Sequence, residues 1–136
     1  MFRFFWLAIS LSLLVVGCGG RQSDLTVDQA IQAFTNAGLE CENPQTIDPN
    51  DTSPVPKTFT EAKRCVVPSV NADHGLRVFA FASDRDLQQV QAYYEGFTGM
   101  FGSYVFVRDN LLFQTSVSMP KELADQYQET FQTFTP

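Results

Sequence analysis

The sequence predicts an α+β fold: a two-layer sandwich in which amphipathic helices cover one face of an antiparallel sheet of about four strands. Two observations predict it. Segments with apolar residues at helical spacing alternate with pairs of strand-like segments, and a short polar turn joins each pair. Short turns favour antiparallel pairing, and each helix has one apolar stripe to bury. The expected order is α-β-β-α-β-β-α within a single domain over residues 26–136.

The first helix is expected to begin after Thr26 and to end before Gly38. Thr26 and Gln29 have the spacing of a capping box, in which each side chain accepts a hydrogen bond from the other residue's backbone N–H. Gly38 followed by Leu39 is typical of a helix stop with a hydrophobic contact after it. The apolar stripe between these signals consists of Val27, Ala30, Ile31, Phe34 and Ala37.

Two strands are predicted next, over residues 64–68 and 76–82, with a turn at residues 71–75 between them. In the second strand Phe79 and Phe81 lie on one face, and smaller apolar side chains alternate with them on the other. Small side chains allow close approach of a helix, so the helices are expected to cover the face opposite the two phenylalanines.

The second helix is predicted to begin after Ser83, because Ser83 and Asp86 form an S-x-x-D cap. A hairpin follows, with strands over residues 104–107 and 111–117 about an Asp-Asn turn, residue types that tolerate positive φ. Pro120 is expected at the first position of the last helix. The stripes of the two helices are Leu87, Val90, Tyr94 and Phe97, then Leu123, Tyr127, Phe131 and Phe134.

Residues 1–17 have the parts of an export signal. A single basic residue, Arg3, precedes an uncharged and mostly apolar run over residues 4–16. As a helix this run spans about 20 Å, which is shorter than the ~30 Å hydrocarbon core that a permanent transmembrane helix must cross. A helix that is apolar all round, at the chain terminus, is also a poor candidate for a core helix. The run is therefore interpreted as the apolar region of a signal peptide.

The end of this segment, Val15-Val16-Gly17-Cys18, resembles the lipobox of bacterial lipoproteins. The resemblance implies that the Cys18 sulfur carries diacylglycerol and that cleavage occurs before it, with residues 18–25 as a lipidated tether. The mature protein is then expected on the extracytoplasmic side of the cell membrane or the outer membrane, held there by two or more acyl chains. A plain cleaved signal and an uncleaved anchor are the alternatives.

Two further cysteines, Cys41 and Cys65, are expected to form a disulfide, because an exported protein is in an oxidising compartment. The bridge would close a segment that has four prolines and little apolar periodicity. Two separate buried thiols are the alternative. A metal site is not expected, because there is no C-x-x-C motif and His74 is the single histidine.

Charge excludes some partners. The chain has a net charge of −6, and its nine Lys and Arg residues are scattered along the sequence, so binding to nucleic acid is not expected. No cofactor motif is recognised: the glycines at 96, 99 and 102 lack the lysine and the preceding strand of a phosphate loop. The Asp-rich segment 48–51 lacks the layout of a calcium loop.

Part of the domain resembles a group of small, largely uncharacterised bacterial lipoproteins. The resemblance lies in IQAFTNAGLE at residues 31–40, VPS at 67–69, YYE at 93–95 and FVRDNLLFQ at 106–114. It implies one domain and no particular activity.

Three functions remain open from the sequence. The leading hypothesis is a non-enzymatic envelope lipoprotein that binds a protein or another envelope component, with Phe79 and Phe81 as candidate partner-binding aromatics if that sheet face is exposed; as core residues they would have no such role. The second is a small hydrolase that uses Asp73 and His74, although no nucleophile is recognised. The third is an inhibitor that presents the loop closed by Cys41 and Cys65.

Overall fold

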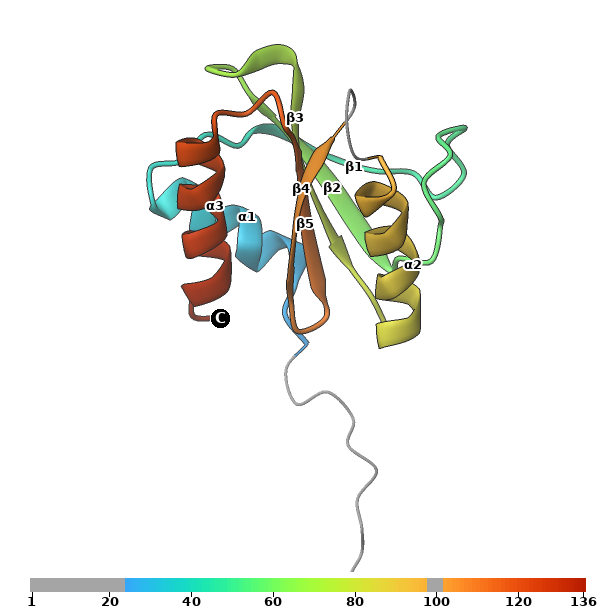
Figure 1. Cartoon of the computed structure of the whole chain (residues 1–136). Helices are drawn as coiled ribbons and strands as arrows, with labels where there is room; N and C mark the ends of the chain where they lie inside the picture. The colour runs from blue at the N-terminus through green and yellow to red at the C-terminus, as the bar shows by residue number, and fades with distance from the viewer. Residues whose placement is uncertain (1–23, 98–101) are drawn as a thin grey trace, which may run out of the picture.

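The computed structural model describes residues 24–97 and 102–136, so the expected signal and Cys18 lie outside the described residues (Figure 1). Within that part, helices and strands alternate as an α+β fold, which confirms the predicted class. The elements are α1 (Val27–Asn36), β1 (Glu42–Thr46), β2 (Glu61–Val67), β3 (Asn71–Ala80), α2 (Asp84–Glu95), β4 (Ser103–Arg108), β5 (Leu111–Ser116) and α3 (Lys121–Thr133).

The described strands form one five-stranded antiparallel sheet in the order β1-β2-β3-β5-β4, one strand more than the sequence predicts. The additional strand, β1, is an edge strand that pairs with β2 and is exposed along its whole length. Asn43 has a φ of 49°, and the pairing register shifts between Glu42 and Gln45. Such an irregular polar edge strand has no buried face. Its sequence therefore has no alternation of apolar and polar residues from which a strand could be predicted.

The fold has three layers, not the two that the sequence predicts. Helices α1 and α3 pack on one face of the sheet, and α2 packs on the other (Figure 1). Helices can cover both faces of the sheet because its central strands carry apolar side chains on both faces. Val78 and Phe113 belong to the core cluster that includes residues of α1 and α3, whereas Phe79 and Leu112 belong to the cluster under α2.

The predicted ends of α1 are confirmed. Thr26 Oγ1 accepts from the Gln29 N–H at 3.1 Å, and Gln29 Oε1 accepts from the Thr26 N–H at 2.8 Å, which completes the capping box. At the other end Gly38 has a φ of 76°, and the Leu39 N–H bonds the Phe34 carbonyl at 2.9 Å. This is a Schellman stop, and it places Leu39 against the core.

The predicted turn at residues 71–75 is wrong, because β3 already begins at Asn71 and the turn lies just before it, where the Val70 N–H bonds the Val67 carbonyl. Composition suggested a turn because Asn, Asp and Gly cluster there. Position 75 is a glycine for a different reason. A Cβ there would lie 1.6 Å from the Cys65 carbonyl oxygen, so β2 and β3 can approach this closely only at a residue without a side chain.

The N-terminal end of the described domain is attached to the β4–β5 hairpin. Asn110 Oδ1 accepts from the Leu25 N–H at 2.9 Å, and Asn110 Nδ2 donates to the Leu25 carbonyl at 2.8 Å. Leu25 is buried, although the sequence assigned it to the tether. None of the helices within the described ranges is both long and apolar enough to span a membrane.

Candidate functional site

The predicted disulfide is present. Cys41 and Cys65 are bonded, with their Cα atoms 4.9 Å apart, and both are buried in the core on the α1 and α3 side. The bond joins the chain just before β1 to the middle of β2. It therefore closes the base of the Pro-rich loop over residues 47–60, which connects these two strands on the α2 side of the sheet.

Phe79 and Phe81 are core residues, so the exposed aromatic patch considered from the sequence is not present. Their exposed fractions are 1% and 3%. The physical reason is the third layer: Leu87, Val90 and Tyr94 of α2 cover this face, and Phe59 of the loop packs edge-on against Phe79.

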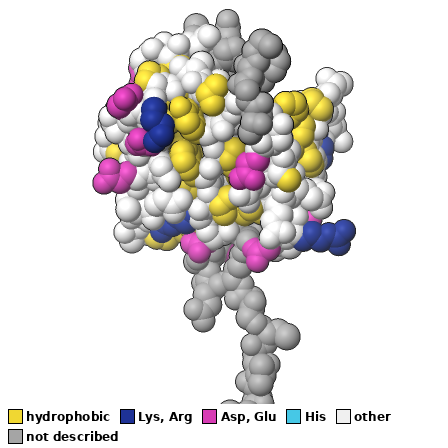
Figure 2. Space-filling view, viewed as in Figure 1, with side chains coloured by type: hydrophobic (Ala, Val, Ile, Leu, Met, Phe, Trp, Pro, Cys, Tyr) yellow, Lys and Arg dark blue, Asp and Glu magenta, His cyan; other side chains and the backbone are white. Residues whose placement is uncertain are grey.

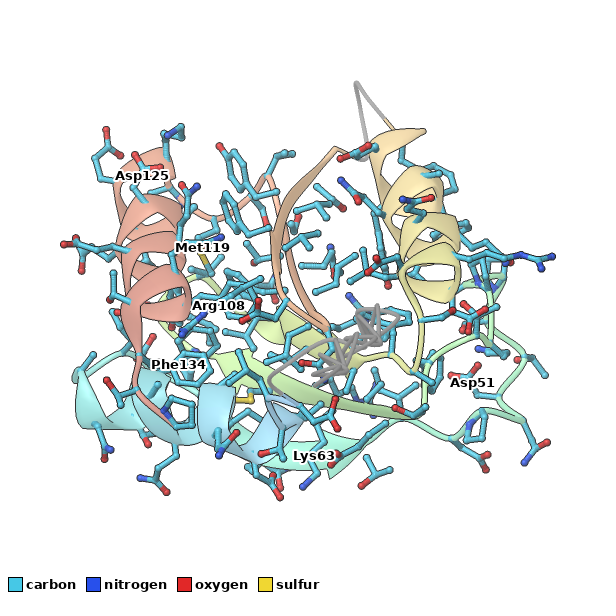
Figure 3. The ribbon with its side chains drawn as sticks, turned by 90° about the horizontal axis from the view of Figure 1, so that it is seen from below. Asp51, Lys63, Arg108, Met119, Asp125 and Phe134 are labelled. Atoms are coloured by element: carbon cyan, nitrogen blue, oxygen red, sulfur yellow. A yellow bond between two sulfur atoms is a disulfide. The ribbon has the colours of Figure 1, made fainter. Side chains whose placement is uncertain are left out.

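A cavity of about 440 Å³ lies beside α2, where the loop folds over the sheet. Its floor comes from β2 and β3, one wall from the loop, and another from the last turn of α2. In Figure 3 this is the side on which Asp51 is labelled, across the sheet from Arg108 and Phe134 near α3. The lining residues are Thr46, Ile47, Asp48, Asp51, Ser53, Val55, Lys57, Phe59, Arg64, Arg77, Phe79 and Tyr94.

The floor of the cavity contains two arginines in direct cross-strand register, Arg64 of β2 and Arg77 of β3. Like charges at such positions, with Cβ atoms about 5 Å apart, destabilise a sheet unless something compensates them. Each guanidinium donates instead to the glutamine on its outer side: Arg64 to Gln45 Oε1 at 2.8 Å, and Arg77 to Gln114 Oε1 at 3.0 Å. These acceptors are neutral, so both positive charges remain.

Among the side chains that the structure describes, no carboxylate lies within ion-pair distance of Arg64 or Arg77. The cavity lining also contains two carboxylates, Asp48 and Asp51. Asp51 accepts from Lys57 and Ser53, which lower its pKa to about 2. At neutral pH Lys57 therefore balances Asp51, and the two arginines exceed the charge of Asp48 by one. The arginine pair contrasts with the surface in Figure 2, which shows scattered basic side chains and no continuous basic area on that face.

Tyr94 lines the cavity from the last turn of α2 and contributes a buried polar group. The residue is 7% exposed, and its hydroxyl has no hydrogen-bond partner among the described residues. Burial raises the pKa of Tyr94 to about 12, while the positive charge of Arg77 acts in the opposite direction. At neutral pH the group is therefore a protonated phenol with a proton to donate.

A second hollow, of about 510 Å³, lies between α1 and the end of α3. It is lined by neutral side chains such as Gln32, Asn36 and Thr130 and is more open than the cavity beside α2. Charge and an unsatisfied buried donor therefore distinguish the cavity beside α2 as the candidate site.

The other residues considered from the sequence do not assemble a site. Asp73 and His74 are in β3, but their side chains lie outside what the structure describes. In the described ranges no cluster of three or more His, Cys, Asp or Glu side chains could hold a metal ion. Asp48 accepts from the Asn50 N–H at 2.8 Å, which is an ordinary polar turn.

Sequence reasoning missed Arg64, Arg77 and Tyr94 as site residues. One signal was available: Arg77 precedes Phe79 by two residues, so it lies on the same strand face as the phenylalanines. Comparison of the chain with protein families, with curated proteins and with solved structures finds no match.

Proposed function

We propose that this chain is a non-enzymatic lipoprotein of the cell envelope, anchored to a membrane through lipid on Cys18, and that it binds an envelope component in the cavity beside α2. The anchor is supported by the lipobox-like ending Val15-Val16-Gly17-Cys18 and the apolar run before it. The Cys41–Cys65 disulfide is consistent with an oxidising compartment outside the cytoplasm.

The observation that carries the binding function is the composition of the cavity. Its volume is within the range of small-molecule sites, and its wall and floor combine apolar side chains with a few polar groups that converge on one place. The inhibitor hypothesis has less support, because in the stiff segment Pro54-Val55-Pro56, Pro54 is exposed but Val55 and Pro56 are half-buried.

The binding function is tested by retention of envelope components on the immobilised full-length mature protein. Detergent-solubilised envelope is passed over wild type and over Val55→Trp, which places a bulky side chain in the cavity wall. Thr133→Trp is the matched control, because it adds the same side chain to the groove between α1 and α3. We expect mass spectrometry to find a component that wild type and Thr133→Trp retain and Val55→Trp does not. Equal retention by all three proteins would contradict the proposal.

The anchor is tested separately. Protein isolated from native cells should have the intact mass of residues 18–136 plus a diacylglyceryl group and any additional acyl chain. The Cys18→Ser variant should lose these groups and should no longer partition into the detergent phase. An unmodified sulfur at position 18 in the native protein would contradict the anchor, whatever the binding experiment shows.

A further inference from the structure

We infer that the cavity beside α2 binds a small organic anion, whose carboxylate or phosphate lies against Arg64, Arg77 and Tyr94 and whose apolar body packs against the loop. The inference rests on the binding function proposed above and specifies the chemical class of the ligand.

The arginine pair favours an anion. Arg64 and Arg77 lie opposite each other in the floor, and their hydrogen bonds to Gln45 and Gln114 occupy part of each guanidinium and neutralise neither. A guanidinium has five N–H donors, so each arginine keeps donors for a ligand. An oxyanion between them would convert a repulsive cross-strand pair into two charge-assisted contacts.

Tyr94 supplies a donor that is independent of the arginines. A buried hydroxyl without a partner costs about 1–3 kcal/mol, a cost that a folded protein rarely carries without a reason. Tyr94 lines the same cavity as Arg77. The hydroxyl oxygen itself is buried, so a ligand oxygen held by Arg77 would accept from it once the side chains that cover it shift on binding, which would remove the unsatisfied group.

The rest of the cavity selects an apolar body of limited size. Ile47, Val55 and Phe59 of the loop are half-buried, and Phe79 extends the apolar surface onto the floor. At ~30 Å³ for each water-sized group, a volume of about 440 Å³ accommodates roughly 15 non-hydrogen atoms. An aromatic or short aliphatic acid, or its phosphate analogue, fits within this volume.

The experiment is calorimetric titration of the full-length mature protein in detergent. The anionic probes are 3-phenylpropanoate and phenyl phosphate, and the neutral probe is 3-phenylpropanamide. Acetate and inorganic phosphate test the anionic group without an apolar body. We expect the anionic aromatic probes to bind at least about tenfold more tightly than the amide and than either small anion, as charge-assisted contacts predict. The tighter of the two aromatic probes identifies the preferred anionic group.

Four variants test the residues. Arg77→Gln should lower the affinity for the tighter-binding anionic probe about tenfold or more. Arg64→Gln and Tyr94→Phe should each lower that affinity about threefold or more. Arg64 is exposed, so its replacement leaves the core intact even if Arg77→Gln is destabilised. Arg85→Gln is the matched control: it makes the same change of charge on the exposed surface of α2, and the affinity should not change.

The outcomes separate this inference from the proposed function. The anion site is overturned if the amide binds as tightly as the anionic probes. It is also overturned if Arg64→Gln and Tyr94→Phe both leave the affinity for the anion unchanged. If no probe binds while an envelope component is retained by wild type and lost with Val55→Trp, the ligand class is wrong and the binding function stands. If neither experiment detects binding, both are wrong.

Discussion

Tyr94 and Tyr127 are both buried tyrosines, but their hydroxyl groups differ. The Tyr127 hydroxyl donates to the Glu40 carbonyl at 2.5 Å, whereas that of Tyr94 has no partner among the described residues. Removing an unsatisfied buried hydroxyl relieves its desolvation cost, and removing a bonded one leaves a buried acceptor without its donor. The two residues therefore form a natural pair for comparison.

We predict that, without ligand, Tyr94→Phe raises the free energy of unfolding by about 1 kcal/mol at pH 8, whereas Tyr127→Phe lowers it by about 1 kcal/mol or more. Urea unfolding followed by circular dichroism measures both. A loss of stability in Tyr94→Phe would mean that its hydroxyl has a partner after all.

The pH dependence of Tyr94→Phe follows from the pKa of Tyr94, which is about 12 in the folded protein against 10 for an ordinary tyrosine. Between these values the folded state keeps a proton that the unfolded state releases, so wild-type stability falls as the pH rises. The variant lacks this contribution. Its advantage over wild type should therefore grow by about 1.4 kcal/mol between pH 8 and pH 11. An advantage that does not change with pH would contradict this assignment.

Gly75 is required for a close approach of two strands. We predict that Gly75→Ala lowers the free energy of unfolding by at least about 3 kcal/mol, since a Cβ there overlaps the backbone of Cys65 and Val66. Gly96→Ala is the control: its Cβ would lie 3.2 Å from the nearest atom, at the end of α2, and should change stability by less than about 1 kcal/mol. Equal effects in chemical denaturation would show that the strands can separate at no great cost.

At the scale of elements, the disulfide attaches the irregular edge strand β1 to β2. The chain between Cys41 and Cys65 has a sequence separation of 24 residues, and closing it removes conformational freedom from the unfolded state. We predict that Cys41→Ser combined with Cys65→Ser lowers the free energy of unfolding by about 3.5 kcal/mol. Denaturation of the double variant beside the oxidised and reduced wild type measures this. An unchanged midpoint would mean that β1 and its loop are held by other contacts.

The elements that the sequence predicted well are those with local signals. The caps at Thr26 and Ser83, the stop at Gly38 and the hairpin turn at Asp109 depend on side chains within a few residues of the backbone groups they satisfy. Strand β1 has no such signal: its residues are exposed, and pairing with β2 is what makes it a strand. The turn placed at residues 71–75 was wrong for a related reason, because the glycine there serves a contact with the paired strand β2.

At the scale of the molecule, the number of layers and the cavity could not be predicted, since both depend on how distant segments meet. Placing a helix on the second sheet face required knowing that this face of the assembled sheet is also apolar. The cavity required the register that brings Arg64 opposite Arg77 and the path of the loop between β1 and β2. The disulfide was predictable because it followed from the expected export signal and a count of cysteines.

We predict that Asn110→Ala lowers the free energy of unfolding by about 2 kcal/mol, because it leaves the N–H and carbonyl of Leu25 buried without partners. The loss should be greatest where the N-terminal end of the domain meets the β4–β5 hairpin. Hydrogen exchange should therefore accelerate more in α1, which follows Leu25, than in α2 on the opposite face. Uniform acceleration in both helices would contradict this local effect.

The attachment of Leu25 to Asn110 also determines where a mechanical force would enter the domain. A pull on the chain before Asp24 would act first on two hydrogen bonds at the tip of the β4–β5 hairpin, and then on α1. The arginine floor and the loop lie on the opposite face of the sheet, and the disulfide holds the base of that loop. Force applied at this end of the chain would therefore separate α1 from the sheet first, and the cavity on the opposite face would keep its shape under load.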